Sequence, residues 1–263
     1  MPTVDFEAYL NFDYDGGKPF DVETLLRMED EAGIEVAVVM PANNGPAPER
    51  SLNVQPDNER VGKAIKGNKR LIGCATINPA LGIDNIKKQY AIADEYGFKG
   101  PKLMAVLHRY NIDDEIVDPV MAMCRERGQV ASIHSGGTGN DCVHPNRIAN
   151  VAARFPEVPI IVDHMGYPDA TEDAIRAAEE HPNLYLGTTI LRFFREDPAN
   201  CVPQAVAEAV RRVGPERVVW GSNLPEYPHS ALWCRRAIER LKLGADAERL
   251  IFGENLTQLY KLA

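Results

Sequence analysis

The chain has 263 residues, of which 44% are hydrophobic and 25% are charged, a balance typical of globular proteins. A formal net charge of −9 with scattered Lys and Arg residues argues against nucleic-acid binding, and no apolar run reaches the roughly 18 residues of a membrane span. The five cysteines are widely spaced and the N-terminus lacks a signal-peptide pattern, which predicts a cytoplasmic protein without a disulfide framework.

One unit, a short apolar run followed by a turn and an amphipathic helix, occurs eight times. The predicted strands are 4–9, 35–40, 71–77, 98–104, 130–135, 160–165, 184–189 and 217–223. The predicted helices lie near 21–33, 56–67, 82–96, 114–127, 145–155, 170–181, 202–213 and 230–242, with further helical signals near 245–249 and 255–262. Strands that alternate with helices pair in parallel through right-handed crossovers. Eight units in about 250 residues predict a single (β/α)8 TIM barrel, of the α/β class, with residues 1–263 as one domain.

Polar side chains stand near the points where several of these strands end. Glu7 lies in the first strand and Lys102 in the fourth. His134 and His164 lie near the ends of the fifth and sixth strands, and Asn223 ends the eighth. Because the active sites of such barrels form at the C-terminal ends of the strands, we expect four of these side chains to converge on one mouth, those of Glu7, His134, His164 and Asn223.

Two histidines and a carboxylate can bind a divalent metal such as Zn or Mn through nitrogen and oxygen. Glu7, His134 and His164 are therefore the predicted ligands. A metal there could acidify a water or polarise a carbonyl group. His164 could instead act as a free general base or acid, because histidine side chains ordinarily titrate near neutral pH.

Each candidate also has a purely structural interpretation. Glu7 could be the buried partner of Lys102, since an unpaired buried charge is costly. Tyr9 could fill the core, although its hydroxyl could face a substrate. Asn223 could serve only to turn the chain after the last strand. His229 lies on the loop that follows; with Tyr9 and Lys102, it is a candidate for substrate binding.

Several segments follow a family pattern in their order and spacing, almost from end to end. They are 4–10 (VDFEAYL), 57–60 (DNER), 70–73 (RLIG), 97–103 (GFKGPKL), 133–136 (IHSG), 154–156 (RFP), 163–166 (DHMG), 181–183 (HPN), 217–223 (RVVWGSN) and 255–260 (NLTQLY). Together they resemble the amidohydrolase-related proteins that include aminocarboxymuconate-semialdehyde decarboxylase and the dicarboxylate lactonases. The resemblance implies a barrel with metal ligands from strands one, five and eight and a catalytic histidine on strand six. It makes His134 a ligand and His164 the catalytic residue or a second ligand.

The chain departs from this pattern at its centre. Glu7 and Tyr9 replace both histidines of the family's His-x-His strand, Asn223 replaces the aspartate of strand eight, and Met104 replaces a frequent histidine. Glu7 resembles a branch of decarboxylases in which glutamate is a ligand. Asparagine cannot accept a proton from water, which weakens the usual aspartate-based hydrolysis. Since the family also includes metal-free members, the resemblance implies either one divalent metal or a metal-free site.

The resemblance favours hydrolysis of a small carboxylated or cyclic metabolite, a lactone or an amide. His164 would transfer protons, with Asn223 in the site, and Lys102 or a metal would polarise the carbonyl. The alternative is metal-dependent, non-oxidative decarboxylation of a small aromatic or unsaturated acid, with Glu7 and His134 among the ligands. Glu7 favours decarboxylation, whereas the short chain, without the insertions expected of the decarboxylases, favours hydrolysis.

A third alternative is a barrel that binds a metabolite without turning it over. In each case the expected partner is a small molecule, and neither nucleic acid nor a membrane is expected. A homodimer is compatible with the resemblance, because barrels of this family often pair.

Overall fold

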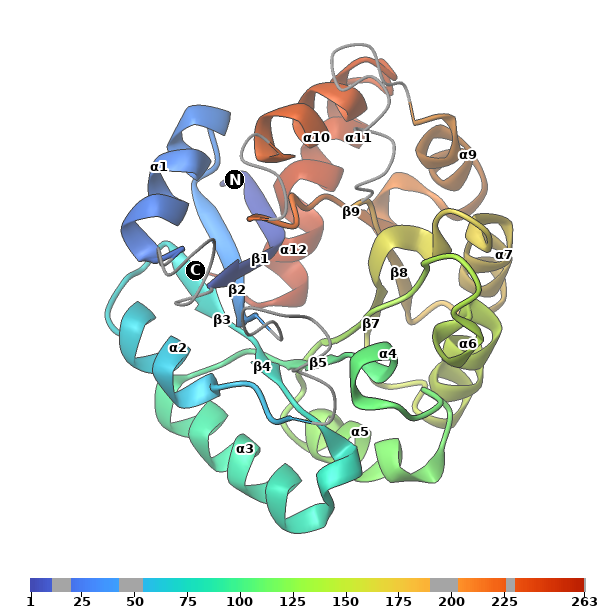
Figure 1. The fold of residues 1–263 in the computed structure, drawn as a ribbon. Helices are drawn as coiled ribbons and strands as arrows, with labels where there is room; N and C mark the ends of the chain where they lie inside the picture. The colour runs from blue at the N-terminus through green and yellow to red at the C-terminus, as the bar shows by residue number, and fades with distance from the viewer. Residues whose placement is uncertain (11–19, 43–53, 190–202, 226–229, 263) are drawn as a thin grey trace.

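The computed structural model describes residues 1–10, 20–42, 54–189, 203–225 and 230–262. Within these ranges parallel strands lie at the centre and helices surround them (Figure 1). The strands are β1 (Val4–Leu10), β2 (Val36–Pro41), β3 (Leu71–Gly73), β4 (Ala75–Thr76), β5 (Pro101–Leu103), β6 (Ala131–Ile133), β7 (Ile160–Val162), β8 (Leu184–Gly187) and β9 (Val218–Val219).

The helices follow the strands in alternation, as the predicted units require. They are α1 (Val22–Ala32), α2 (Asn58–Ile65), α3 (Ile83–Tyr96), α4 (Ala105–His108), α5 (Asp118–Glu126), α6 (Pro145–Arg154), α7 (Thr171–Glu180), α9 (Gln204–Val213), α10 (Ser230–Glu239), α11 (Ala245–Arg249) and α12 (Asn255–Leu259). Local sequence signals mark several of their ends. Asp21 caps α1 by accepting a hydrogen bond from Thr24 N, and Gly33 ends that helix in the left-handed conformation that glycine adopts without strain. No helix in the described part of the chain combines the length and the apolar character of a membrane span.

The strands form two sheets, β1-β2-β3 and β4-β5-β6-β7-β8-β9. The predicted strand 71–77 is divided into β3 and β4 at Cys74, where the chain changes partners. Cys74 N donates to Val39 O at 2.8 Å on one side, and Ala75 N donates to Gly100 O at 2.9 Å on the other. The two short strands therefore occupy one position, and the structure confirms the predicted (β/α)8 barrel with eight strand positions.

The first and last strands meet without a regular ladder. Single backbone hydrogen bonds join them instead, among them Phe6 N to Trp220 O at 3.2 Å and Asn223 N to Glu7 O at 2.8 Å. The predicted last strand, 217–223, is accordingly reduced to the two residues of β9, because Trp220 N donates to Ile251 O rather than to a strand.

Alternate residues of the strands face two hydrophobic cores. In β2, Ala37 and Val39 belong to the layer between strands and helices, whereas Val38 and Met40 belong to a second, separate cluster. That second cluster joins residues of five other strand positions with Tyr260, near the C-terminus. This two-faced burial is expected for parallel strands that are covered by helices on one side and packed against each other on the other.

Candidate functional site

Glu7 occupies a bulge in the first strand. Asp5 pairs with Ala37 of β2 and Ala8 pairs with Val39, so β1 has one more residue than β2 between these two pairs and the ladder is interrupted. The freed Glu7 N donates instead to the Asp5 carboxylate at 3.1 Å. Bulges commonly redirect a side chain next to an active site. Here the bulge accompanies a Glu7 side chain that is fully buried and points to β5.

Lys102 is a buried ammonium that joins two carboxylates. Its Nζ lies 2.8 Å from Glu7 Oε1 and also bonds to Asp163 Oδ2, and all three side chains are fully buried. A third hydrogen bond of 3.3 Å runs to Ser132 Oγ on the paired strand β6. An ammonium group has three hydrogens to donate, and all three are used. The predicted pairing of Glu7 with Lys102 is confirmed.

His164 is fixed by its neighbours Asp163 and Thr189. Its Nδ1 contacts the Thr189 carbonyl oxygen and lies 2.9 Å from Thr189 Oγ1, while Nε2 lies 3.3 Å from Asp163 Oδ2. Thr189 Oγ1 donates to Asp163 Oδ1 at 2.6 Å. A carbonyl oxygen can only accept, so Nδ1 carries a hydrogen and Nε2 is the nitrogen that can exchange a proton. The His164 side chain is 12% exposed, which leaves it accessible to a small molecule.

The backbone after β7 makes a tight turn that presents the His164 ring. His164 and Met165 have φ angles of 56° and 48°, in the left-handed region that residues with side chains adopt infrequently. Two bonds hold this turn: Ser135 Oγ donates to the Asp163 carbonyl oxygen, and Gly166 N donates to Ser135 Oγ at 2.9 Å. A conformation of this kind persists only where the surroundings enforce it, and it is concentrated at functional sites.

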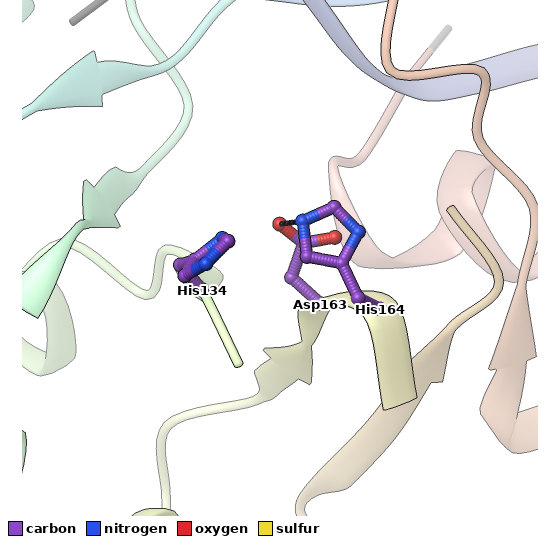
Figure 2. A group of neighbouring side chains, drawn as sticks. All are labelled: His134, Asp163 and His164. Carbon is purple, nitrogen blue, oxygen red and sulfur yellow. Dashed lines mark ion pairs between the residues drawn. The ribbon is translucent and has the colours of Figure 1, made fainter. Parts of the chain in front are cut away.

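His134 completes the group at the end of β6. Its ring lies edge-on to that of His164, with centroids 4.9 Å apart. One ligand atom each from His134, Asp163 and His164 lie within 4.8 Å of one another. Figure 2 shows the two imidazoles and the carboxylate gathered in one place.

Burial and charge set the protonation of the cluster formed by Glu7, Lys102, His134, Asp163 and His164. Burial would raise the pKa of Asp163, but His164 and Lys102 outweigh it and hold that pKa well below its usual range. Burial would lower the pKa of Lys102, but Asp163 and Glu7 raise it above the ordinary value. Burial, with a smaller contribution from Asp163, raises the pKa of Glu7 despite Lys102. Burial, with His164 and Lys102, holds the pKa of His134 well below its usual range, so this imidazole is neutral at neutral pH.

The donor set suits a divalent metal of the Zn or Mn type in part. Two imidazoles and one carboxylate are ligands that such ions accept. Within this group of side chains, two buried atoms have no hydrogen-bond partner among the described residues, His134 Nδ1 and Glu7 Oε2, and both are able to ligate. The group with ligand atoms within 4.8 Å contains Asp163 where the sequence predicted Glu7, so Glu7 as a ligand stays a prediction.

The other predicted site residues lie as follows. Tyr9 is close to the cluster, and its hydroxyl donates to Glu7 Oε1. Asn223 is 7% exposed, with a left-handed φ of 57°, and its backbone lies beside Glu7. Lys102 is fully buried with its hydrogens committed, so contact with a substrate would require one of those bonds to break. His229 lies outside the described residues.

Asp5 is a supporting residue that sequence reasoning missed. Its carboxylate is fully buried and accepts from Ser222 N at 2.8 Å and from Ser222 Oγ, which ties the start of β1 to the segment that carries Asn223. Burial raises the pKa of Asp5 to about 6, although hydrogen bonds from its neighbours oppose that rise. The signal in the sequence was its place two residues before Glu7, on the strand already singled out.

Comparison with known proteins agrees with this architecture. An uncharacterized TIM-barrel protein from Bordetella bronchiseptica is 19% identical over 100% of this chain and 99% of its own, with a TM-score of 0.78. A putative 2-pyrone-4,6-dicarboxylic acid hydrolase from Pseudomonas putida is 15% identical over 99% of this chain and 98% of its own, with a TM-score of 0.73. A dihydroxybenzoic acid decarboxylase from Polaromonas sp. JS666, with bound manganese and the inhibitor 2-nitroresorcinol, is 17% identical over 99% of this chain and 97% of its own, with a TM-score of 0.68.

These identities are low, so the structural similarities show the fold alone. No curated protein matches the sequence. The model of the amidohydrolase family, however, matches residues 26–262, almost the whole chain. Structures similar to this chain include proteins named as hydrolases and as decarboxylases, and one of them holds a divalent metal. The chain belongs to the amidohydrolase family.

Proposed function

We propose that this protein is a hydrolase that opens a small cyclic or carboxylated substrate, a lactone or an amide, at the mouth of the barrel. The observation that carries the proposal is the Asp163–His164–Thr189 arrangement. It orients one imidazole through Nδ1 and leaves Nε2 to exchange protons, next to a buried carboxylate. General acid–base catalysis needs a group positioned in this way.

The residues divide the work of hydrolysis. As water oxygen attacks the substrate carbonyl carbon, His164 Nε2 takes the proton that the water loses. The Asp163 carboxylate, 3.3 Å away, stabilises the resulting imidazolium. When the carbon–oxygen or carbon–nitrogen bond breaks, the imidazolium returns the proton to the leaving atom. Lys102 acts as a positioning residue, because its ammonium is ion-paired with the Asp163 carboxylate and, after His164, helps to lower the pKa of Asp163. Neutral His134 offers a hydrogen-bond donor to a substrate oxygen.

A decarboxylase is the second candidate, and the His134–Asp163–His164 group favours it. These three residues, with Glu7 in addition, would hold a divalent ion. Such an ion would supply a positive charge for a substrate carboxylate and an adjacent hydroxyl. The similar structure with bound manganese is named as a decarboxylase, which supports testing both reactions.

The product formed distinguishes the candidates. The purified protein is incubated with a panel of small lactones, cyclic amides and hydroxylated aromatic acids, and acid formation and carbon dioxide are measured in parallel. Hydrolysis is expected to release acid from a lactone, or an amino acid from a cyclic amide, without carbon dioxide. Carbon dioxide from an aromatic acid would establish the decarboxylase instead. Saturable binding without turnover of any compound would point to the metabolite-binding barrel.

The role of Thr189 can be tested by changing it to Val, which keeps the shape and removes the hydroxyl. We expect kcat to fall on the order of tenfold to a hundredfold, with little change in KM, because the imidazole and Asp163 lose their shared contact. The matched control is Thr188→Val. Thr188 is as deeply buried, but its hydroxyl has no hydrogen-bond partner among the described residues, so kcat should be unchanged. Equal losses in both variants would show that Thr189 acts only through packing.

A further inference from the structure

The Asp163 carboxylate belongs to two groups of side chains at once. It is one of three residues whose ligand atoms lie close enough to hold a metal ion, with His134 and His164. It is also bonded through Oδ2 to the Lys102 ammonium. We propose that Lys102 is an internal cation that takes the electrostatic place of a divalent ion, so that the intact site binds such ions weakly.

The hydrogen bonds around Lys102 leave little room for a second cation. Both Asp163 oxygens are occupied, Oδ2 by Lys102 and Oδ1 by the Thr189 hydroxyl. Glu7 Oε1 is occupied as well, 2.8 Å from Lys102 Nζ. A metal ion at Asp163 would have to displace one of these donors. Of the four carboxylate oxygens of Glu7 and Asp163, only Glu7 Oε2 accepts no hydrogen bond from the described residues.

The charges lead to the same conclusion. The carboxylates of Glu7 and Asp163 carry two negative charges and the Lys102 ammonium returns one positive charge, so these three ion-paired side chains together have a net charge of −1. A divalent ion at Asp163 would lie next to the ammonium, in a region from which water is excluded. Repulsion between close charges of like sign is strong where the local dielectric constant is low. The ion and the protonated lysine therefore compete for the same carboxylate.

This inference deepens the proposed hydrolase, and it rests on that proposal for the identity of the site. The Lys102 ammonium is then the cation that balances the charge of the buried carboxylates during the reaction. Lys102 is ion-paired with the Asp163 carboxylate, Asp163 supports the His164 imidazolium, and the three groups perform the proton transfer with residues of the chain itself. The two ideas can fail separately, because ion affinity and turnover are measured independently.

Removing the lysine charge tests the competition. Mn²⁺ and Zn²⁺ are each titrated into the wild type and a Lys102→Met variant, and the dissociation constants are measured by calorimetry. The variant is expected to bind on the order of a hundredfold more tightly than the wild type, because the ammonium no longer opposes the ion. Lys99→Met is the matched control. It removes the same charge from an exposed position three residues away and should leave the affinity unchanged.

A second variant guards against loss of folding. Glu7→Gln combined with Lys102→Met removes one charge of each sign, keeps the net charge of the cluster and retains His134, Asp163 and His164. It should also bind more tightly than the wild type, and a further His134→Ala change should abolish that gain. The proposal is overturned if neither variant that lacks Lys102 binds the ions more tightly than the wild type does. It is also overturned if the wild type itself binds one ion tightly and stoichiometrically at His134.

Discussion

Replacing His164 with Asn is expected to lower kcat about 10²- to 10⁴-fold, the range that a positioned general base contributes. The carboxamide keeps a donor for the Thr189 carbonyl oxygen but cannot take a proton from water. Asparagine is the appropriate replacement because it tolerates the left-handed backbone of this position, where φ is 56°. The loss should appear equally in kcat and in kcat/KM, since the proton transfer belongs to the transition state.

The control for this experiment is His144→Asn. His144 precedes α6 and caps that helix by accepting from Asn146 N at 3.3 Å, a role that asparagine fills as well. The change removes an imidazole from the neighbouring loop without touching the cluster, and kcat should not change. Steady-state kinetics of both variants would be compared with their melting temperatures. A His164→Asn protein that is folded and retains wild-type kcat would remove His164 from the mechanism.

Much of the fold could be predicted because it depends on patterns that repeat along the chain. The alternation of apolar runs and amphipathic helices indicates a parallel barrel, and the mouth of a barrel follows from where its strands end. For this reason Glu7, His134 and His164 could be expected at one mouth before their contacts were known. Strand lengths could not be predicted as well. Regular pairing at β9 covers two residues, because Trp220 N finds a partner in the segment around Ile251.

The chemistry of the cluster depends on contacts that no pattern records. Asp163 and Thr189 were part of predicted strands, but their roles come from a turn with two left-handed residues after β7. The bulge in β1 is equally local, and Glu7 lies within it. Lys102 was expected to reach a substrate carbonyl. Three acceptors take up its hydrogens, and only distances between atoms of distant segments reveal this.

Lys102→Met is expected to lower the free energy of unfolding by about 3–5 kcal/mol near neutral pH, because breaking a buried ion pair leaves the partner charges uncompensated. Both Glu7 and Asp163 lose their counter-charge at full burial. Urea unfolding measures this difference, and Lys99→Met, at the exposed position, should cost little.

The loss of stability should depend on pH in a defined direction. In the wild type the pKa of Asp163 is held below its ordinary value, so this residue contributes stability that is present above its unfolded pKa and is lost as the pH falls. In the variant both carboxyls lose the lowering effect of Lys102, so the pKa of Asp163 should be higher than in the wild type, and the pKa of Glu7, already raised by burial, should rise further. A raised carboxyl pKa has the opposite effect: the stability that the group contributes is present below its unfolded pKa and is lost as the pH rises through the folded value.

The difference in the free energy of unfolding between wild type and variant should therefore be widest at pH 8 and narrow toward pH 4. A gap that stays constant over this range would mean that Lys102 contributes packing rather than charge. The Glu7→Gln and Lys102→Met double variant should recover part of the loss at pH 8, because one of the two uncompensated charges is gone.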